Sequence, residues 1–197
     1  MIEKICNSTI KYFGRTLSLS EDEKIIYQFC LEALLSKLLF IIVILLFWVL
    51  TKRIIISLLY ISTLAPLRSF GGGAHLSTRL KCNLLSYSIS FFSILLCPVI
   101  CKYTSFELWS ILFILFLTYT LFRTPVDTKN KRFKYKLKEN LKTKYQQFVL
   151  VLSFVFFVLL MLEQIELLGI ITICVIIFSI GIIIGTLQNK REFSNDF

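Results

Sequence analysis

The sequence predicts an all-α polytopic membrane protein. Hydrophobic residues make up 56% of the 197-residue chain, and its mean hydropathy of +0.78 is well above that of soluble domains. The apolar residues form long blocks, which a soluble globule of this size could not bury. The net charge of +10 lies in short segments between the blocks, which favours loops beside an anionic lipid bilayer and argues against nucleic-acid binding. We therefore expect one membrane-embedded domain, residues 1–197, with about six hydrophobic segments and amphipathic cytoplasmic helices.

Residues 1–32 are expected to form an amphipathic N-terminal region. Apolar residues from Ile2 to Phe13 recur at nearly helical spacing, which predicts a helix on the membrane surface or packed on the cytoplasmic side of the protein itself. Ser20-Glu21-Asp22-Glu23 then has the S-x-x-E form of a capping box. A second helix should begin there and continue into the first apolar block.

Six apolar blocks follow. The first two lie within residues 33–67 and are separated by Lys52-Arg53. The second of them has about fourteen residues, fewer than the roughly 20 that a full span needs, so it is expected to be tilted, re-entrant or buried among other helices. The other four are long enough, or nearly so, to span: 84–101 and 104–122 within segment 84–122, and 146–162 and 167–187 within segment 146–187.

The orientation of the spans follows from the charged loops. Residues 123–144 contain nine Lys or Arg against two acids, so loop 123–145 should be cytoplasmic. Counting spans from it places the 68–83 stretch, the tail 188–197 and the N-terminus in the cytoplasm too. By this count Lys52-Arg53 lies on the outer side of the membrane, where positive charges are unfavourable. We therefore do not expect residues 33–67 to form a simple hairpin.

The basic loop also carries a helical pattern. One stripe is apolar and the neighbouring stripe is basic, which predicts an amphipathic helix at the cytoplasmic interface. Two explanations stay open: the charges only determine topology, or they attract an acidic peptide. The apolar stripe is Phe133, Leu137, Leu141, Tyr145 and Phe148, and the basic stripe is Lys134, Lys138 and Lys142.

Residues 68–83 form a polar stretch between apolar blocks. It holds three of the seven glycines and the only histidine, followed seven residues later by Cys82. A thiolate attacks carbonyl groups, and an imidazole can take the thiol proton and return it to a leaving amine. Cys82 and His75 are therefore a candidate nucleophile and base, and Arg79, Lys81 and a nearby helix N-terminus would favour the thiolate. Cys97 and Cys101, one helical turn apart, have no histidine with them, so we expect neither a metal nor a cofactor.

Geometry adds a constraint on this pair. Residues seven apart on a straight helix are separated by about 10.5 Å along its axis, whereas hydrogen-bond reach is roughly 3 Å. We therefore predict that the glycines break the helix, that the next helix begins after His75 near Ser77, and that His75 folds back over Cys82. The backbone N–H groups of Gly72 and Gly73 are candidate oxyanion donors. Arg68 is expected to bind a substrate carboxylate or to hold the loop.

These residues resemble the signature of the accessory gene regulator B (AgrB) family of membrane-embedded cysteine endopeptidases. Arg68, Gly72-Gly73-Ala74-His75 and Cys82 match R-x-x-x-G-G-x-H-x-x-x-x-x-x-C, and Thr124–Lys131 is similar to the family's P-V-D/E-x-x-N-K segment. Gly71 extends the usual double glycine, and Arg132 stands where a proline often follows the second motif.

The resemblance implies that the protein processes a small quorum-sensing propeptide. Cys82 would cleave it at the C-terminal side of the signal sequence and keep the acyl group as a thioester, which an internal Cys or Ser of the peptide attacks to form a ring. An acidic propeptide tail would dock on the basic segment, and the resemblance also implies a homodimer. The expected docking residues are Lys129, Lys131, Lys134, Lys138 and Lys142.

Two other functions are compatible with the same composition. A peptide or small-molecule transporter would explain several spans and a glycine-rich break, but the second half repeats no such break and Lys37 and Glu107 are among few intramembrane charges. A non-enzymatic membrane regulator would use the glycines for packing. The sequence leaves open which propeptide is processed, the type of ring and any third residue that orients His75, for which Asp127 is a candidate.

Overall fold

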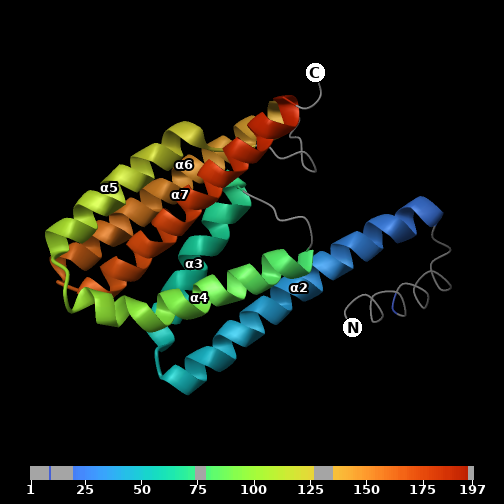
Figure 1. Cartoon of the computed structure of the whole chain (residues 1–197). Coiled ribbons are helices and arrows are strands. Elements are labelled where there is room, and N and C mark those ends of the chain that lie inside the picture. Colours follow the sequence, from blue (N-terminus) through green and yellow to red (C-terminus); the bar gives the residue numbers. More distant parts are fainter. Residues whose placement is uncertain (1–8, 10–19, 74–78, 127–134, 195–197) are drawn as a thin grey trace. The chain divides into compact units, whose positions relative to one another are not determined.

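The computed structural model describes residues 20–73, 79–126 and 135–194, together with residue 9. These residues contain six helices and no strand, so the all-α prediction is confirmed (Figure 1). The predicted N-terminal amphipathic helix lies outside the described residues. The helices are α2 (Glu21–Thr51), α3 (Ile54–Gly71), α4 (Arg79–Cys101), α5 (Phe106–Arg123), α6 (Tyr135–Met161) and α7 (Ile165–Ser194).

The chain divides into two compact units, and the first, residues 1–51, contains α2. The predicted capping box is confirmed at the start of this helix. The Ser20 backbone N–H and hydroxyl each donate to Glu23 Oε2 at 2.9 Å, and the Glu23 N–H donates to Ser20 Oγ at 3.4 Å. These hydrogen bonds hold the pKa of the Glu23 carboxyl below its ordinary value. The bond from the Ser20 backbone N–H has the larger effect, and the bond from the Ser20 hydroxyl has the smaller one.

The second unit, residues 52–197, contains α3 to α7. All five helices are long and apolar enough to cross a membrane, which makes this a multi-pass membrane protein. The apolar block that was too short in the sequence belongs to an 18-residue helix, because α3 continues through the polar residues after Leu67 to Gly71. At about 27 Å, α3 is close to the thickness of the hydrocarbon layer. The helix α4 continues through Pro98.

The basic segment differs from the expectation. We predicted a separate interfacial helix within loop 123–145, but residues 135–145 are the first part of α6, which runs unbroken to Met161. The reason lies in the sequence, since no Gly or Pro separates the basic residues from the apolar block that follows. The loop between α5 and α6 is correspondingly shorter.

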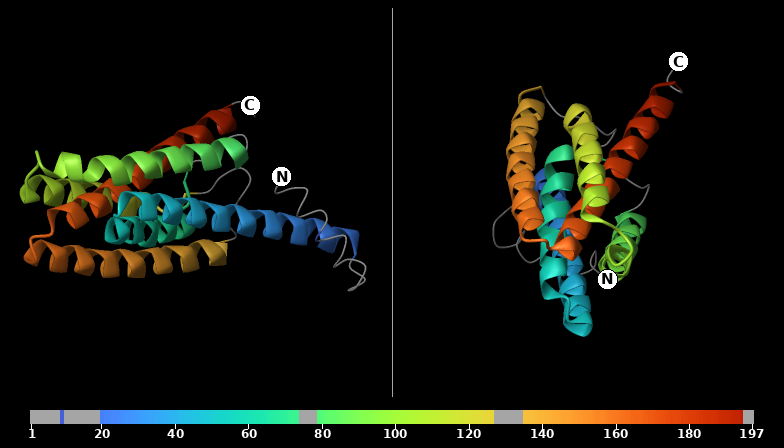
Figure 2. Two further views of the ribbon diagram at one scale, coloured as in Figure 1. Left: turned by 90° about the horizontal axis from the view of Figure 1, so that it is seen from below. Right: turned by 90° about the vertical axis from the view of Figure 1, so that its left-hand side faces the viewer.

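Helix α7 is the centre of the second unit and contacts each of the other four helices (Figure 2). A helix surrounded in this way should be apolar on all sides, and the block 167–187 satisfies this condition. Its most buried apolar side chains have at most 1% of their surface exposed: Leu168, Ile170, Ile171, Cys174, Val175, Phe178 and Ile182.

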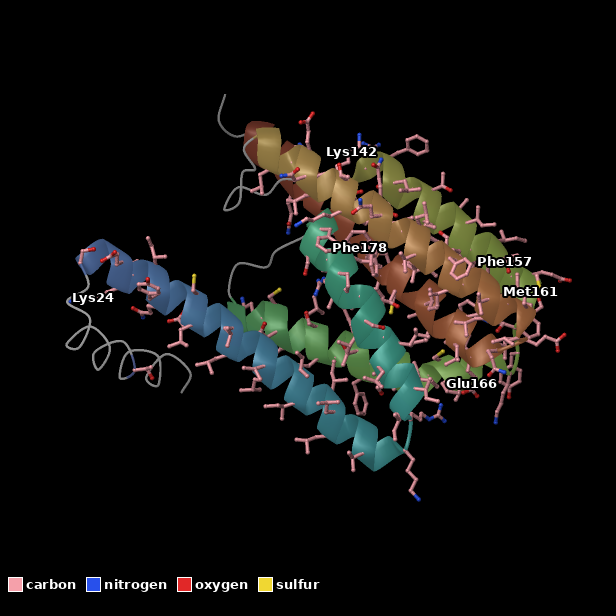
Figure 3. All side chains as sticks on the ribbon, turned by 180° about the vertical axis from the view of Figure 1, so that it is seen from behind. Lys24, Lys142, Phe157, Met161, Glu166 and Phe178 are labelled. Atoms are coloured by element: carbon pink, nitrogen blue, oxygen red, sulfur yellow. The ribbon has the colours of Figure 1, made fainter. Side chains whose placement is uncertain are left out.

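The α6–α7 connection lies at one end of the unit. Figure 3 shows Met161 and Glu166 together at this end and Lys142 at the other. Here the buried thiols of Cys97 and Cys101 donate to the carbonyls of Glu166 and Ile165, each at 3.5 Å. A Cβ at Gly169 would lie 2.5 Å from Cys101 Sγ, so a glycine is required where α4 crosses α7.

Substitution of Gly169 tests this crossing. Gly169→Ala should lower the free energy of unfolding by about 1–2 kcal/mol, because overpacking against buried thiols exceeds the gain in helix propensity. The measurement is thermal unfolding in nanodiscs. Gly181→Ala is the matched control on the same helix, since a Cβ there has no neighbour within 4 Å and the variant should be at least as stable as wild type. Equal effects of the two substitutions would contradict the prediction.

Candidate active site

The helix break predicted at the glycines is observed. Helix α3 ends at Gly71, and the Gly72 N–H donates to the Arg68 carbonyl at 3.3 Å. Gly72 has φ +76° and Gly73 has φ +130°, a region of backbone space that L-residues with a side chain rarely adopt. The chain therefore leaves the helix at this point because two successive residues lack a Cβ atom.

Cys82 lies in the first turn of α4, and its thiol is half-buried. Helix α4 is described from Arg79 onward, and the predicted start near Ser77 lies outside the described residues. The helix dipole at this end favours a negative charge, as the proposed thiolate requires. His75 lies in 74–78, outside the described residues, so its approach to Cys82 stays a prediction.

The second sequence motif contacts the glycine break directly. The Val126 N–H donates to the Gly71 carbonyl at 3.0 Å, and Gly72 and Val126 form a parallel bridge. Thr124, Pro125 and Val126 are all buried. Asp127, the candidate orienting residue, lies outside the described residues. Gly71 and Val126 are 55 residues apart in the sequence, and their contact joins the two motifs into one structural unit.

The three glycines lie against different parts of the second unit. A Cβ at Gly71 would collide with the ring of Phe178 and lie 3.1 Å from Thr124 Cγ2. A Cβ at Gly72 would lie 2.5 Å from the Val126 carbonyl oxygen, and one at Gly73 would lie 3.6 Å from the backbone of α7. Gly71 and Gly72 are therefore required by close packing.

A buried polar cluster supports this packing. Tyr145 of α6 donates from its hydroxyl to Thr120 Oγ1 at 2.6 Å, and Thr124 Oγ1 donates to the Thr120 carbonyl at 2.8 Å. The Tyr145 ring also lies 5.9 Å from the ring of Phe178, centroid to centroid. Since buried hydroxyl groups without partners are costly, these bonds hold α5 and α6 in register beneath the glycine break.

Sequence reasoning missed most of this support. Tyr145 was assigned to the apolar stripe of an interfacial helix, but it is fully buried and bonded across to α5. Phe178 lies in a uniformly apolar block that gives no signal of its role. Ser86 could have been found, because it follows Cys82 by four residues and so lies near the same face of a helix.

Arg68 is exposed in the last turn of α3 and donates from Nη1 to Ser86 Oγ at 3.0 Å. Of its two expected roles, this contact favours holding the loop. Gly72 is less suited to the oxyanion role than expected, because its N–H already donates to the Arg68 carbonyl. Gly73 stays a candidate donor.

The basic residues divide into two groups. Lys142 is exposed on the first part of α6 (Figure 3), and Lys138 is half-buried one turn earlier. Lys129, Lys131 and Lys134 lie outside the described residues. Within the described part of the chain, no three His, Cys, Asp or Glu side chains are grouped so as to hold a metal ion.

Comparison with protein families finds one match. The sequence model described as accessory gene regulator B (AgrB) matches residues 6–186, nearly the whole chain. Searches of curated proteins and of solved structures find no match.

The fit at the glycines can be tested by paired substitutions. Gly71→Ala should lower the free energy of unfolding by about 1–3 kcal/mol, and Phe178→Leu should relieve much of this effect by making room for the new methyl group. Gly72→Ala should be at least as destabilising, and Val126→Ala should not relieve it, because the clash involves a backbone oxygen. Thermal unfolding of the single and double variants in nanodiscs provides the measurement. Additive effects of Gly71→Ala and Phe178→Leu would contradict the prediction.

Proposed function

Because the chain belongs to the accessory gene regulator B family, a role in processing a quorum-sensing propeptide fits it, and we propose that it acts as a cysteine endopeptidase. One observation supports this most directly. The glycine break ends α3 shortly before His75, and α4 begins with Cys82 in its first turn. A continuous helix from His75 to Cys82 would keep these two side chains about 10.5 Å apart along its axis, and a helix break just before His75 supports a path of the chain that brings them together.

The proposed first step transfers the peptide to the enzyme. His75 takes the thiol proton, and Cys82 Sγ attacks the carbonyl carbon at the C-terminal end of the signal sequence. The Gly73 N–H is a candidate donor to the oxyanion. His75 then returns the proton to the departing amine, the C–N bond breaks, and the signal sequence stays on Cys82 as a thioester.

The second step releases the peptide as a ring. An internal thiol or hydroxyl of the bound peptide gives its proton to His75 and attacks the thioester carbonyl, the bond to Cys82 Sγ breaks, and Cys82 leaves as a thiolate. When the attacking group is a thiol, one thioester replaces another at little cost in free energy, so no ATP is needed. Water must be kept from the acyl-enzyme, since hydrolysis would release a linear peptide.

The propeptide would be recognised by the first part of α6. The loop between α5 and α6 contains Val126, which is hydrogen-bonded to Gly71, so the basic segment and the glycine break lie at the same end of the second unit. Arg68, Lys81, Arg123 and Lys142 lie at this end too. We propose that this end faces the cytoplasm and an acidic propeptide tail, in a protein of the cell membrane.

Substitution of the reactive pair tests the proposed reaction. Cys82→Ser and His75→Ala should each abolish propeptide cleavage without reducing the amount of folded protein, because each removes a group required for acyl transfer. The measurement is mass spectrometry of the purified protein with the propeptide from the neighbouring reading frame. Cys30→Ser is the matched control, since this free, exposed thiol lies on α2 and should be dispensable. Intact cleavage by Cys82→Ser would leave the transporter or the regulator as the function.

Charge reversal tests the docking surface. Changing Lys134, Lys138 and Lys142 together to Glu should raise KM about tenfold or more and leave kcat nearly unchanged, since each exposed pair contributes roughly 0.2–1 kcal/mol. The wild-type KM should also rise with ionic strength. Lys144→Glu is the control, because this exposed residue lies on the same helix but off the stripe. Unchanged KM in the triple variant would contradict the docking role.

A further inference from the structure

A polar seam between α3 and α4 leads to Cys82. Cys82, Ser86 and Ser90 recur every four residues, so they follow one another along one side of α4. Ser90 Oγ is hydrogen-bonded to Tyr60 Oη of α3 at 3.0 Å, and both residues are 1% exposed. Ser86 Oγ accepts from Arg68 Nη1 at 3.0 Å. Because both serines contact α3, Cys82 is the next position of α4 along this seam.

The two contacts are spaced differently on the two helices. Tyr60 and Arg68 are separated by eight residues, about 12 Å along α3, whereas Ser90 and Ser86 are separated by four residues, about 6 Å along α4. The side chain that joins the two helices at Ser86 must therefore be long enough to span the difference between these two separations. In Figures 1 and 3 the C-terminal end of α3 and the N-terminal end of α4 lie apart. The hydrogen bond from Arg68 Nη1 to Ser86 Oγ connects the two helices near these ends.

The Arg68–Ser86 hydrogen bond also joins the two ends of the segment that contains His75 and Cys82. Arg68 lies four residues before Gly72, and Ser86 lies four residues after Cys82. Between them are two glycines in backbone conformations that other residues avoid, and glycine has the greatest conformational freedom of any residue. A hydrogen bond between the two helices therefore limits the separation across which His75 must reach Cys82.

We propose that Ser86 is a positioning residue for the reaction at Cys82. Its hydroxyl binds the Arg68 guanidinium at a position one helical turn along α4 from Cys82 and ties the end of α3 to the start of α4. This inference rests on the proposed function. It differs from direct recognition of a substrate carboxylate by Arg68, for which Ser86 would be dispensable.

Kinetics of matched serine variants separate the two roles of Arg68. The full-length protein in nanodiscs is assayed with the propeptide from the neighbouring reading frame. Ser86→Ala should lower kcat about tenfold with KM within about twofold, because a hydrogen bond to a charged group orients the site and not the substrate. Ser86→Thr keeps the hydroxyl and should recover most of the rate. Ser88→Ala is the control, since this exposed serine donates only within its own helix, to the Leu84 carbonyl, and should behave as wild type.

Hydrogen exchange provides a readout that does not depend on cleavage. Backbone amides between residues 69 and 85 should exchange faster in Ser86→Ala than in wild type or Ser88→Ala, as the tie between the helices is lost. Wild-type kcat in Ser86→Ala, or an equal loss in Ser88→Ala, would overturn the positioning role. If the wild-type protein cleaves nothing, the proposed function fails. In that case unchanged hydrogen exchange in Ser86→Ala would also overturn the proposed link between α3 and α4. Faster exchange in Ser86→Ala would still support that link.

Discussion

The hydrogen bond from the Val126 N–H to the Gly71 carbonyl holds the two parts of the candidate site together. It forms where α3 ends, and the absence of side chains at Gly71 and Gly72 lets the backbone after α5 approach the break. A backbone bond of this kind is insensitive to the identity of the Val126 side chain but depends on the glycines. The glycines therefore do more than interrupt a helix, because they provide the surface on which the second motif binds.

This contact in turn depends on the packing of α7. Phe178 fills the space below Gly71, and its ring also lies beside Tyr145 of α6. Tyr145 is bonded to Thr120 of α5, so a polar contact between α5 and α6 adds to the packing on α7 at this end. In a lipid environment an unpaired hydroxyl has no water to bond, which makes such pairing more selective for one arrangement than aliphatic packing alone.

The proposed reaction needs a peptide to reach a nucleophile at the end of a membrane-spanning helix, and the arrangement of the helices is compatible with this. Cys82 lies in the first turn of a spanning helix, at the end where basic side chains gather. The first part of α6 continues directly into its span, so a peptide bound to Lys142 would be held by an element that is rigidly connected to the core. The polar seam of α4 continues from Cys82 toward the interior through Ser86 and Ser90.

The sequence by itself determined the helical class, four of the five candidate spans, the capping box at Ser20 and the break at the glycines. Each of these follows from local patterns: hydropathy, cap spacing and the lack of a Cβ atom. The sequence also singled out Cys82 and His75, since reactive side chains in a polar stretch are visible without a structure. Only the tertiary structure decided that Val126 bonds Gly71, that Tyr145 is buried, and that Arg68 bonds Ser86. These contacts join residues on different helices, and no local periodicity encodes which faces of two apolar helices meet.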